Sequence, residues 1–342
     1  MEDEEFDDIL IRKEIWRYHV ISYLTPSDIL IFKQISRLGK QVSVGLFSER
    51  YIIASGLNAF IFDAETHQVI QTLKGHTDCI RCCKFSRDGR RVVTISEDDT
   101  AKIWDSLTGT ILFTFEGNWA RACHFSPDGT LLITASSNDY TARVCNAKNG
   151  RYIFILNHTD IVWDCAFAPD SKRIVTASFD FTARVWCAET GVCELTLTHQ
   201  DFVNCCSFSH NGKYIVTGGD DDTARIWNAS DGSLEKTLRH ERWVKRCAFS
   251  FDDKLLVTAT SNYPKHDKVL LIWDTQNGTI KSKLEGNYDY ILSCCFSIDG
   301  NRLLSTTTDL TARIWDVHTG RILSKFCFNH HPQSCDISAF CS

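Results

Sequence analysis

The stretch VWDCAFAPDSKRIVTASFDFTARVWCAETGVCELTL, residues 162–197, decides the fold. It contains four short runs of mainly β-branched, aromatic and other apolar residues, separated by Asp, Ser, Pro and Gly: VWDCAF (162–167), RIVTAS (173–178), ARVW (183–186) and VCELTL (192–197). Runs of this length between turn-forming residues predict antiparallel strands joined by tight turns. The stretch therefore predicts one four-stranded antiparallel sheet.

The third run of this stretch recurs along the chain. Copies of TARVW or TARIW, some of them degenerate, end at Phe62, Trp104, Cys145, Trp186, Trp227, Trp273 and Trp315. The intervals are 42, 41, 41, 41, 46 and 42 residues, and the long interval contains the polar segment SNYPKHDK (261–268), which suits a surface loop. Four strands in each of seven repeated units predict an all-β propeller with seven blades.

A closed ring is expected, because unpaired strand edges are costly. Two segments are candidates for the innermost strand of the first blade. The C-terminal segment HPQSCDISAFCS (331–342) is favoured, since its His-to-Phe spacing of nine equals that from His76 to Phe85. The segment VSVGLFS (42–48) is the alternative.

Charge and composition argue against several classes of function. The net charge of -6 over 342 residues gives no reason to expect nucleic acid as a partner, since duplex binding usually needs a basic face. No apolar run approaches about 18 residues, so no membrane span is expected. The N-terminal MEDEEFDD is acidic, unlike an export signal. The sixteen cysteines are therefore expected in a reducing compartment, cytoplasmic or nuclear.

Six cysteines share one position, two residues before the Phe of an inner strand: Cys83, Cys123, Cys165, Cys206, Cys247 and Cys294. Single cysteines on separate blades lack the Cys-x2-Cys spacing of zinc sites. Adjacent cysteines such as Cys82 and Cys83 point to opposite faces of a strand. We predict small buried side chains at this position, in preference to disulfides or metal ligands.

Histidines and aspartates also recur once per unit, whereas a catalytic group is normally unique. His76, His158, His199 and His240 share one position, and a turn aspartate shares another. Neither a Gly-rich phosphate loop nor a nucleophile elbow occurs. The sequence therefore predicts scaffold residues, with no catalytic, cofactor-binding or metal-binding residue. An enzyme is kept only as a remote alternative.

From about residue 41 to its end the chain resembles the WD-repeat β-propeller family. The resemblance rests on GHTDCI (75–80), EDDTAKIWD (97–105) and TDLTARIWD (308–316). It implies a hydrogen-bonded structural tetrad in each of two blades: His76, Ser96, Asp98 and Trp104, and His158, Ser178, Asp180 and Trp186. Other units depart from the pattern through Asn118, Cys145, Gly219 and Asn287, and the resemblance predicts that their blades are less tightly fixed.

The resemblance also implies that partners bind the narrow top face around the central channel. The matching positions in this chain are Arg81, Trp119, Arg121, Trp163, Phe179, Phe202, Asn204, Trp243, Lys245 and Tyr290. Aromatic residues with Arg are typical of binding hot spots. The three cations suggest an acidic or phosphorylated target peptide. The arginine of each TAR motif repeats at one strand position and is interpreted as structural or solvated.

A helical pattern precedes the propeller. Thr25 is a plausible N-cap, with Pro26 at the first helical position. The segment VISYLTPSDILIFKQISR (20–37) resembles an F-box. That family docks on a Skp-type adaptor of a cullin ubiquitin ligase, and the residues carried over are Ile21, Leu24, Pro26, Ile29, Leu30 and Ile35. The alternative is a helical cap packed on the propeller.

Together these observations predict an F-box-like α-helical module (1–40) followed by a seven-bladed propeller of four-stranded antiparallel blades (41–342). The predicted function is a non-enzymatic adaptor that recognises substrates for an SCF-type E3 ubiquitin ligase, with the target bound on the top face. The alternative is a general WD-repeat scaffold for a multiprotein complex, in which residues 1–40 are a structural cap.

Overall fold

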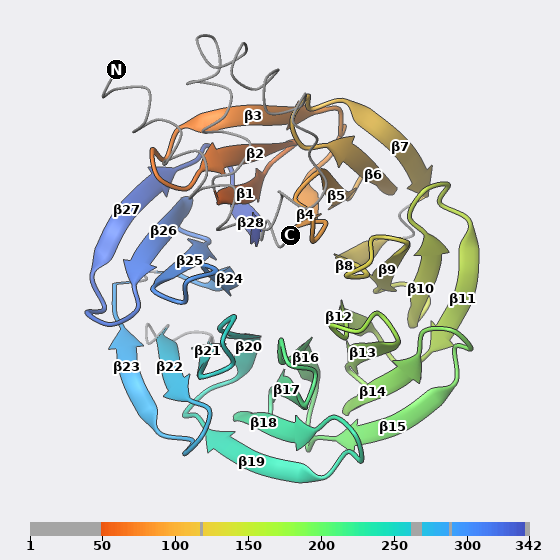
Figure 1. Ribbon diagram of the computed structural model, residues 1–342, viewed down its shortest axis with the longest axis vertical. Helices are drawn as coiled ribbons and strands as arrows, with labels where there is room; N and C mark the ends of the chain where they lie inside the picture. The colour runs from red at the N-terminus through yellow and green to blue at the C-terminus, as the bar shows by residue number, and fades with distance from the viewer. Residues whose placement is uncertain (1–48, 117–118, 261–268, 287–288, 339–342) are drawn as a thin grey trace, which may run out of the picture.

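The computed structural model describes residues 49–116, 119–260, 269–286 and 289–338. Within these ranges 28 β-strands form seven four-stranded antiparallel sheets. Figure 1 shows the sheets arranged radially around a central axis, with one strand of each sheet near the axis and one at the rim. The predicted all-β propeller with seven blades is confirmed. The predicted helical module (1–40) lies outside the described residues.

Six of the sheets are built from consecutive strands, with the first strand innermost. They are β4 (Ile80–Phe85), β5 (Arg91–Ser96), β6 (Thr100–Asp105) and β7 (Ile111–Glu116); β8 (Ala120–Phe125), β9 (Leu131–Ser136), β10 (Thr141–Asn146) and β11 (Tyr152–Asn157); β12 (Val162–Phe167), β13 (Arg173–Ser178), β14 (Thr182–Cys187) and β15 (Cys193–Thr198); β16 (Val203–Phe208), β17 (Tyr214–Gly219), β18 (Thr223–Asn228) and β19 (Leu234–Arg239); β20 (Val244–Phe249), β21 (Leu255–Thr260), β22 (Leu270–Asp274) and β23 (Ile280–Leu284); and β24 (Ile291–Phe296), β25 (Arg302–Thr307), β26 (Thr311–Asp316) and β27 (Ile322–Cys327).

The seventh sheet joins the two ends of the described chain. Its order is β28-β1-β2-β3, from β28 (Pro332–Ser338), β1 (Arg50–Ser55), β2 (Asn58–Asp63) and β3 (Val69–Lys74). The antiparallel β28–β1 pairing places Ser338 opposite Arg50. Closure by the C-terminal strand is therefore confirmed, and the alternative segment (42–48) lies outside the described residues.

The register of β28 corrects the spacing argument. Ile337 pairs with Tyr51 in the way that Phe85 pairs with Val92, so Ile337 occupies the Phe85 position that the sequence assigned to Phe340. Cys335 pairs with Ile53 as Cys83 pairs with Thr94. Cys335 is thus the seventh member of the inner-strand cysteine position.

The hydrophobic core lies between neighbouring sheets. One cluster, for example, combines Val175 and Val185 of the β12–β15 blade with Val203, Phe208 and Trp227 of the β16–β19 blade. Packing of this kind between facing sheets buries apolar side chains from both partners. Each blade is therefore stabilised by its neighbours, which fixes the loops at both ends of the ring.

Antiparallel connections give the ring two different faces. The loop from an outer strand to the next inner strand lies on the same face as the turn between the second and third strands of a blade, as at 75–79 and 97–99. We call this the top face. The turns that follow each inner strand, such as 250–254, lie on the opposite face.

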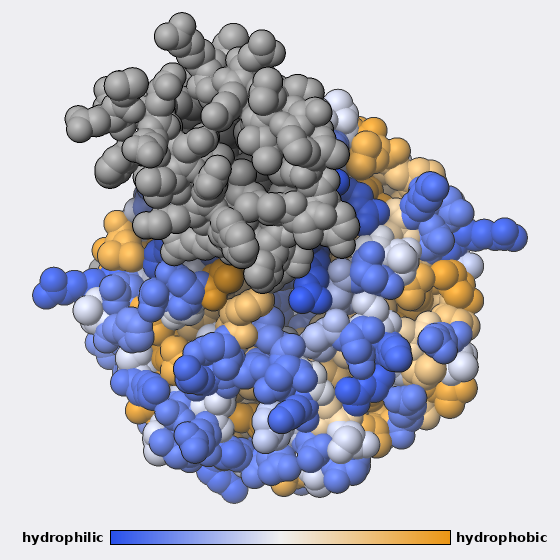
Figure 2. All heavy atoms as spheres, viewed as in Figure 1, coloured by the Kyte–Doolittle hydropathy of each residue, from blue (hydrophilic) through white to orange (hydrophobic). Residues whose placement is uncertain are grey.

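Several outer strands carry exposed apolar side chains, among them Ile111 and Leu112 on β7, and Tyr152, Ile153 and Ile155 on β11. Figure 2 shows hydrophobic residues gathered at the rim of the ring over these strands, while the rest of the visible face is largely hydrophilic. No helix with the length and hydrophobicity of a membrane span occurs in the described part of the chain.

Candidate functional site

A chain of hydrogen bonds fixes the β12–β15 blade. Trp186 Nε1 donates to Thr176 Oγ1 (2.8 Å), Thr176 Oγ1 contacts His158 Nε2 (2.7 Å), and His158 Nδ1 contacts Asp180 Oδ2 (2.8 Å). An indole N–H can only donate, so the threonine hydroxyl accepts from Trp186 and donates to His158. The imidazole proton then lies on Nδ1 and is donated to Asp180.

The β4–β7 blade has the same arrangement, with Thr94 between Trp104 and His76 (2.7 Å to each). The prediction that Ser96 and Ser178 provide the hydroxyl group was wrong. Ser96 Oγ donates to the carbonyl of Asp78 (2.8 Å), and Ser178 Oγ makes the equivalent bond. Each serine is the last residue of its strand and supports the neighbouring loop, whereas the threonine two residues earlier is within reach of both rings.

Gly219 leaves the tetrad of its blade complete, although the sequence predicted a departure from the pattern there. His199 contacts Asp221 (2.9 Å) and Thr217 (2.6 Å), and Trp227 Nε1 donates to Thr217 (2.8 Å). The hydroxyl comes from Thr217, so a serine at position 219 is not needed. A Cβ atom at Gly219 would approach the Phe202 carbonyl oxygen to 2.9 Å, so glycine allows the close approach of this loop.

The charges in these tetrads are held by burial and hydrogen bonding. Burial alone would raise the pKa of Asp98, but hydrogen bonds from Thr100, the Thr77 N–H and His76 outweigh it and lower the pKa to about 2. Burial lowers the pKa of His76 and of His199. The tetrads of His76 and His199 therefore combine a neutral imidazole with an ionised carboxylate, a structural arrangement.

The arginines of the TAR motifs support the turn aspartates four residues earlier. Ion pairs join Arg143 to Asp139 (2.6 Å), Arg184 to Asp180 (3.3 Å), Arg225 to Asp221 (2.9 Å) and Arg313 to Asp309. The arginines therefore brace the turns between the second and third strands.

Two of the three predicted top-face cations already have partners within the chain. Arg81 forms an ion pair with Glu97. Lys245 Nζ lies 2.7 Å from Asp220 Oδ1 and 4.8 Å from the centroid of the Trp243 ring. Arg121 makes no ion pair with any described residue. Of these three cations, Arg121 is therefore the one available to bind an external acidic group.

Asn204 was predicted to be one of the top-face binding residues, and its position in the structure corrects that prediction. Its side chain is buried, and its amide nitrogen donates to Asp220 Oδ1 (2.6 Å) and to the Val244 carbonyl (3.0 Å). The position faces the neighbouring inner strand β20 instead of solvent. Asn204 therefore orients Asp220, and through Asp220 it orients Lys245.

Four aromatic rings form a continuous ladder across two blades of the top face. Trp163 stacks on Phe179 (centroids 5.0 Å apart), Phe179 stacks on Phe202 (4.5 Å), and Phe202 contacts Phe181 (5.6 Å). The Arg121 guanidinium lies over the Trp163 ring at 4.8 Å. We call Trp163, Phe179, Phe202 and Phe181 the aromatic ladder, with Arg121 at its end.

Phe181 was not among the predicted binding residues. It is 44% exposed and has a φ of 67°, a left-handed conformation that is strained for a bulky residue. The equivalent turn positions hold Asp99, Tyr140, Asp222 and Leu310. An aromatic residue at this turn position is a sequence signal that Phe181 shares with Tyr140, and the contact with Phe202 is what places Phe181 in the ladder.

The remaining predicted aromatics flank this region. Trp119 is 53% exposed and precedes β8, and its backbone N–H donates to Asp99 Oδ1 (2.9 Å). Trp243 is 37% exposed and precedes β20. Tyr290 precedes β24 on the same face, and its carbonyl accepts from the Thr308 N–H. The predicted docking residues Ile21, Leu24, Pro26, Ile29, Leu30 and Ile35 lie outside the described residues.

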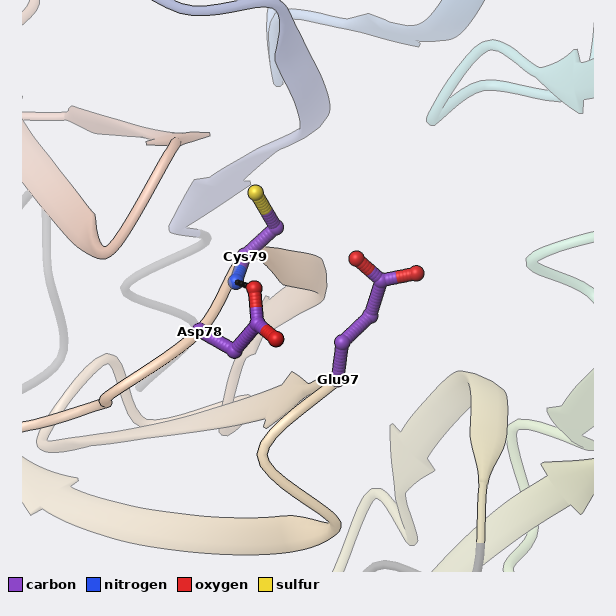
Figure 3. Close-up of side chains that lie close together, drawn as sticks. All are labelled: Asp78, Cys79 and Glu97. Atoms are coloured by element: carbon purple, nitrogen blue, oxygen red, sulfur yellow. Dashed lines mark hydrogen bonds between the residues drawn. The ribbon is translucent and has the colours of Figure 1, made fainter.

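Asp78, Cys79 and Glu97 also come together at the top face (Figure 3). Glu97 is neutralised by Arg81, and Asp78 Oδ1 accepts from the Cys79 N–H (2.7 Å). Burial and the nearby carboxylates raise the pKa of Cys79, which keeps the thiol protonated. The groups already satisfy one another, and we assign no metal ion to them.

The inner strands enclose a channel of about 450 Å³. Arg81, Arg121 and Trp163 line it near the top face. Within it, Lys84 Nζ lies 3.1 Å from Asp336 Oδ1, and burial raises the pKa of Asp164. The channel wall is therefore polar, and the aromatic ladder begins where the channel reaches the top face.

Curated relatives match short parts of this chain. The nuclear distribution protein PAC1 of Komagataella phaffii is 28% identical over 130 residues, which are 35% of this chain and 26% of that protein. The intraflagellar transport protein 122 homolog of Homo sapiens is 34% identical over 64 residues, 18% of this chain and 5% of that protein. A retinoblastoma-binding-like protein E of Dictyostelium discoideum is 34% identical over 56 residues, 16% of this chain and 11% of that protein. These matches span about a quarter or less of each relative.

The family model described as "WD domain, G-beta repeat" matches six segments: 67–105, 109–146, 150–187, 191–228, 232–274 and 278–316. The structure adds a seventh blade, in which Phe62 replaces the tryptophan and the strands come from both ends of the described chain. WD40 propellers of this kind are protein-interaction scaffolds. Since the six matches cover more than half of its residues, the chain belongs to the WD40 repeat family.

Proposed function

We propose that this protein is a non-enzymatic adaptor of the cytoplasm or nucleus that captures a partner protein on its top face. The observation that carries the proposal is the aromatic ladder with Arg121 at its end. Aromatic and arginine side chains dominate binding hot spots because they combine large contact areas with directional contacts. The exposure of Phe181 supports the proposal, since 44% of its surface is accessible to a partner at the end of the ladder.

The geometry suggests the chemistry of the bound segment. Arg81 and Lys245 are paired with Glu97 and Asp220, so a highly acidic partner would have to compete with both carboxylates. Arg121 has no such competitor among the described residues. We therefore expect a segment with an apolar or aromatic side chain on the ladder and one carboxylate or phosphate group on Arg121.

Affinity purification with matched variants tests this proposal. Arg121→Ala with Phe181→Ala should lose partners that the wild-type protein recovers, because both side chains are solvent-accessible parts of the ladder region. Phe251→Ala is the control, since Phe251 is 39% exposed in a turn of the opposite face. The proposal fails if the double variant recovers the same partners as the control, with melting temperatures equal for all three proteins.

A more specific function rests on the sequence of residues 20–37. We propose that this F-box-like segment docks a Skp-type adaptor and cullin, which would make the propeller the substrate receptor of an SCF-type ubiquitin ligase. A pull-down with the full chain and with a chain lacking residues 1–40 distinguishes the alternatives. Recovery of the adaptor and cullin with the full chain alone supports the ligase role. Recovery with neither favours the general scaffold, with residues 1–40 as its cap.

A further inference from the structure

Every inner strand carries a cysteine at the same register position: Cys83, Cys123, Cys165, Cys206, Cys247, Cys294 and Cys335. Strand alternation sends this side chain toward the preceding blade and the residue before it toward the next blade. The chemistry between two blades therefore depends on which residue lies one position earlier on the preceding strand.

In two places that earlier residue is also a cysteine. Cys205 Sγ on β16 lies 3.1 Å from Cys247 Sγ on β20, and Cys82 Sγ on β4 lies 3.6 Å from Cys123 Sγ on β8. A third pair joins the closing strand, where Cys295 Sγ on β24 lies 3.8 Å from Cys335 Sγ on β28. All six are free thiols. Each pair connects neighbouring blades whose strands share no sheet.

One cysteine of each pair lines the channel: Cys82, Cys247 and Cys295. A small solute in the channel can therefore reach the first thiol, and the second thiol lies directly behind it. A hydrogen bond from Cys123 lowers the pKa of Cys82. Burial raises this pKa and the charge of Lys84 lowers it, and the net effect is a lower pKa that favours the reactive thiolate.

We propose that the pairs Cys205–Cys247, Cys82–Cys123 and Cys295–Cys335 are oxidation sites at which a small peroxide forms disulfides between neighbouring blades. One thiol of the pair gives up its proton and attacks one peroxide oxygen, the O–O bond breaks, and the departing hydroxide takes up that proton to form water. The resulting sulfenic acid is attacked by the second thiol, an S–S bond forms, and a second water leaves. Two thiols are oxidised, and one peroxide is reduced to two waters.

The geometry requires only a small movement. A disulfide has an S–S length of about 2.05 Å, so the closest pair must approach by about 1 Å. Such a bridge would close a loop of the chain and join two inner strands that are otherwise held by side-chain packing. The oxidised ring is therefore expected to resist thermal opening better than the reduced ring.

Two neighbouring cysteines provide internal controls. Cys165 and Cys206 also line the channel, but the residues facing them are Ala122 and Asp164. Among the described residues neither of these two cysteines has a thiol partner at hydrogen-bonding distance, and both should stay out of intramolecular disulfides. Ala122→Cys would place a thiol opposite Cys165, in the same relation that Cys82 has to Cys123, and should create a new oxidation site.

The test treats the full-length protein with hydrogen peroxide, blocks remaining thiols with N-ethylmaleimide, and maps disulfide-linked peptides by mass spectrometry. The expected result is linkage of residues 205–247, 82–123 and 295–335, a melting temperature several degrees above that of the reduced protein, and reversal of both by dithiothreitol. Cys205→Ala should remove only the 205–247 linkage. Ala122→Cys should add a linkage between residues 122 and 165.

Three results would overturn the proposal. The first is preferential oxidation of Cys165 and Cys206 while the pairs stay reduced. The second is disulfides scrambled among unrelated cysteines. The third is a folded Ala122→Cys variant that forms no linkage to Cys165. This last variant keeps the proposal testable even if Cys205→Ala fails to fold, because the exchange adds a single sulfur at a position that is 8% exposed.

Discussion

The threonine in the middle of each tetrad joins two buried rings through one hydroxyl group. Thr176 is fully buried and makes the contacts to both His158 and Trp186. Without it, an indole N–H and an imidazole nitrogen would be left in the core without partners. When a buried polar group loses its partner, the folded state is destabilised by the full cost of removing that group from water. At the scale of single residues, the stability of a blade therefore depends strongly on this hydroxyl.

Thr176→Val tests the role of the hydroxyl with little change in shape. We expect the free energy of unfolding to fall by about 2–4 kcal/mol, since two buried groups lose a hydrogen bond. Ser178→Ala removes the bond to the Asp160 carbonyl (3.1 Å) and the bond from the Asp180 N–H (3.1 Å), both only part-buried, and should cost less, about 1–2 kcal/mol. Urea denaturation of both variants measures the difference. An equal or larger loss for Ser178→Ala would contradict the assignment of the tetrad.

His240 makes one blade sensitive to acid. Its Nε2 contacts Thr258 (2.9 Å), its Nδ1 contacts the Leu238 carbonyl (3.0 Å), and burial lowers its pKa from 6.5 to about 4. The unfolded chain binds the proton first, so stability is complete above pH 6.5 and is lost as the pH falls toward 4. The loss amounts to about 3 kcal/mol.

The pH dependence can be assigned by substitution. His240→Gln cannot titrate, so the urea midpoint of this variant should fall less between pH 6.5 and 4 than that of the wild-type protein. At pH 7 both proteins should unfold in a single transition. A variant whose stability falls as steeply as the wild type over this range would exclude His240 as the source.

At the scale of elements, the closing strand β28 is held from both sides. It pairs with β1 in the first sheet, and its Asp336 reaches across to the next blade. Asp336 Oδ1 contacts Lys84 Nζ (3.1 Å), and Asp336 Oδ2 accepts from the Phe85 N–H (2.9 Å). Burial and the Asp336 carboxylate act oppositely on Lys84, and its pKa is raised overall. The carboxylate thus keeps a charged lysine in the channel wall.

Asp336→Ala should destabilise the protein, through the attachment of β28, by more than the loss of a surface ion pair would. We expect about 2 kcal/mol of destabilisation, because Lys84 and the Phe85 N–H both lose a partner that is largely shielded from water. Glu285→Ala is the matched control, since the Lys283–Glu285 pair is exposed at both ends. The control should change stability by well under 1 kcal/mol. Thermal unfolding of the two variants gives the comparison, and equal melting temperatures would argue against a special role for Asp336.

Elements were more predictable from the sequence than contacts between them. The interval between tryptophan positions predicted the blades, and the C-terminal segment was correctly chosen as the closing strand. Position counting could not show that Thr94 instead of Ser96 reaches Trp104, because both lie on one face of the same strand. Nor could it show that Arg81 and Lys245 have partners, or that Cys205 meets Cys247, since these contacts join different blades or loops.

At the scale of the whole molecule, the ring is closed because a strand from the C-terminal end of the described chain joins the sheet formed by its N-terminal end. Six blades are built from consecutive strands, and their neighbours contact them through side-chain packing. The seventh blade differs, because β28 follows β27 in the chain but pairs with β1. Separating the β24–β27 blade from the first blade therefore requires breaking strand hydrogen bonds in addition to packing contacts.

Moving β28 to the other end of the propeller removes this closure without changing any strand. In the rearranged chain, residues 330–338 precede Glu49 through a short turn, and the chain ends at Asn329. All seven blades are then built from consecutive strands, and packing alone closes the ring. Compared with a chain of residues 49–338 in the natural order, we expect a lower urea midpoint and faster hydrogen exchange in β24–β28. Equal midpoints and equal protection would show that packing between blades suffices to close the ring.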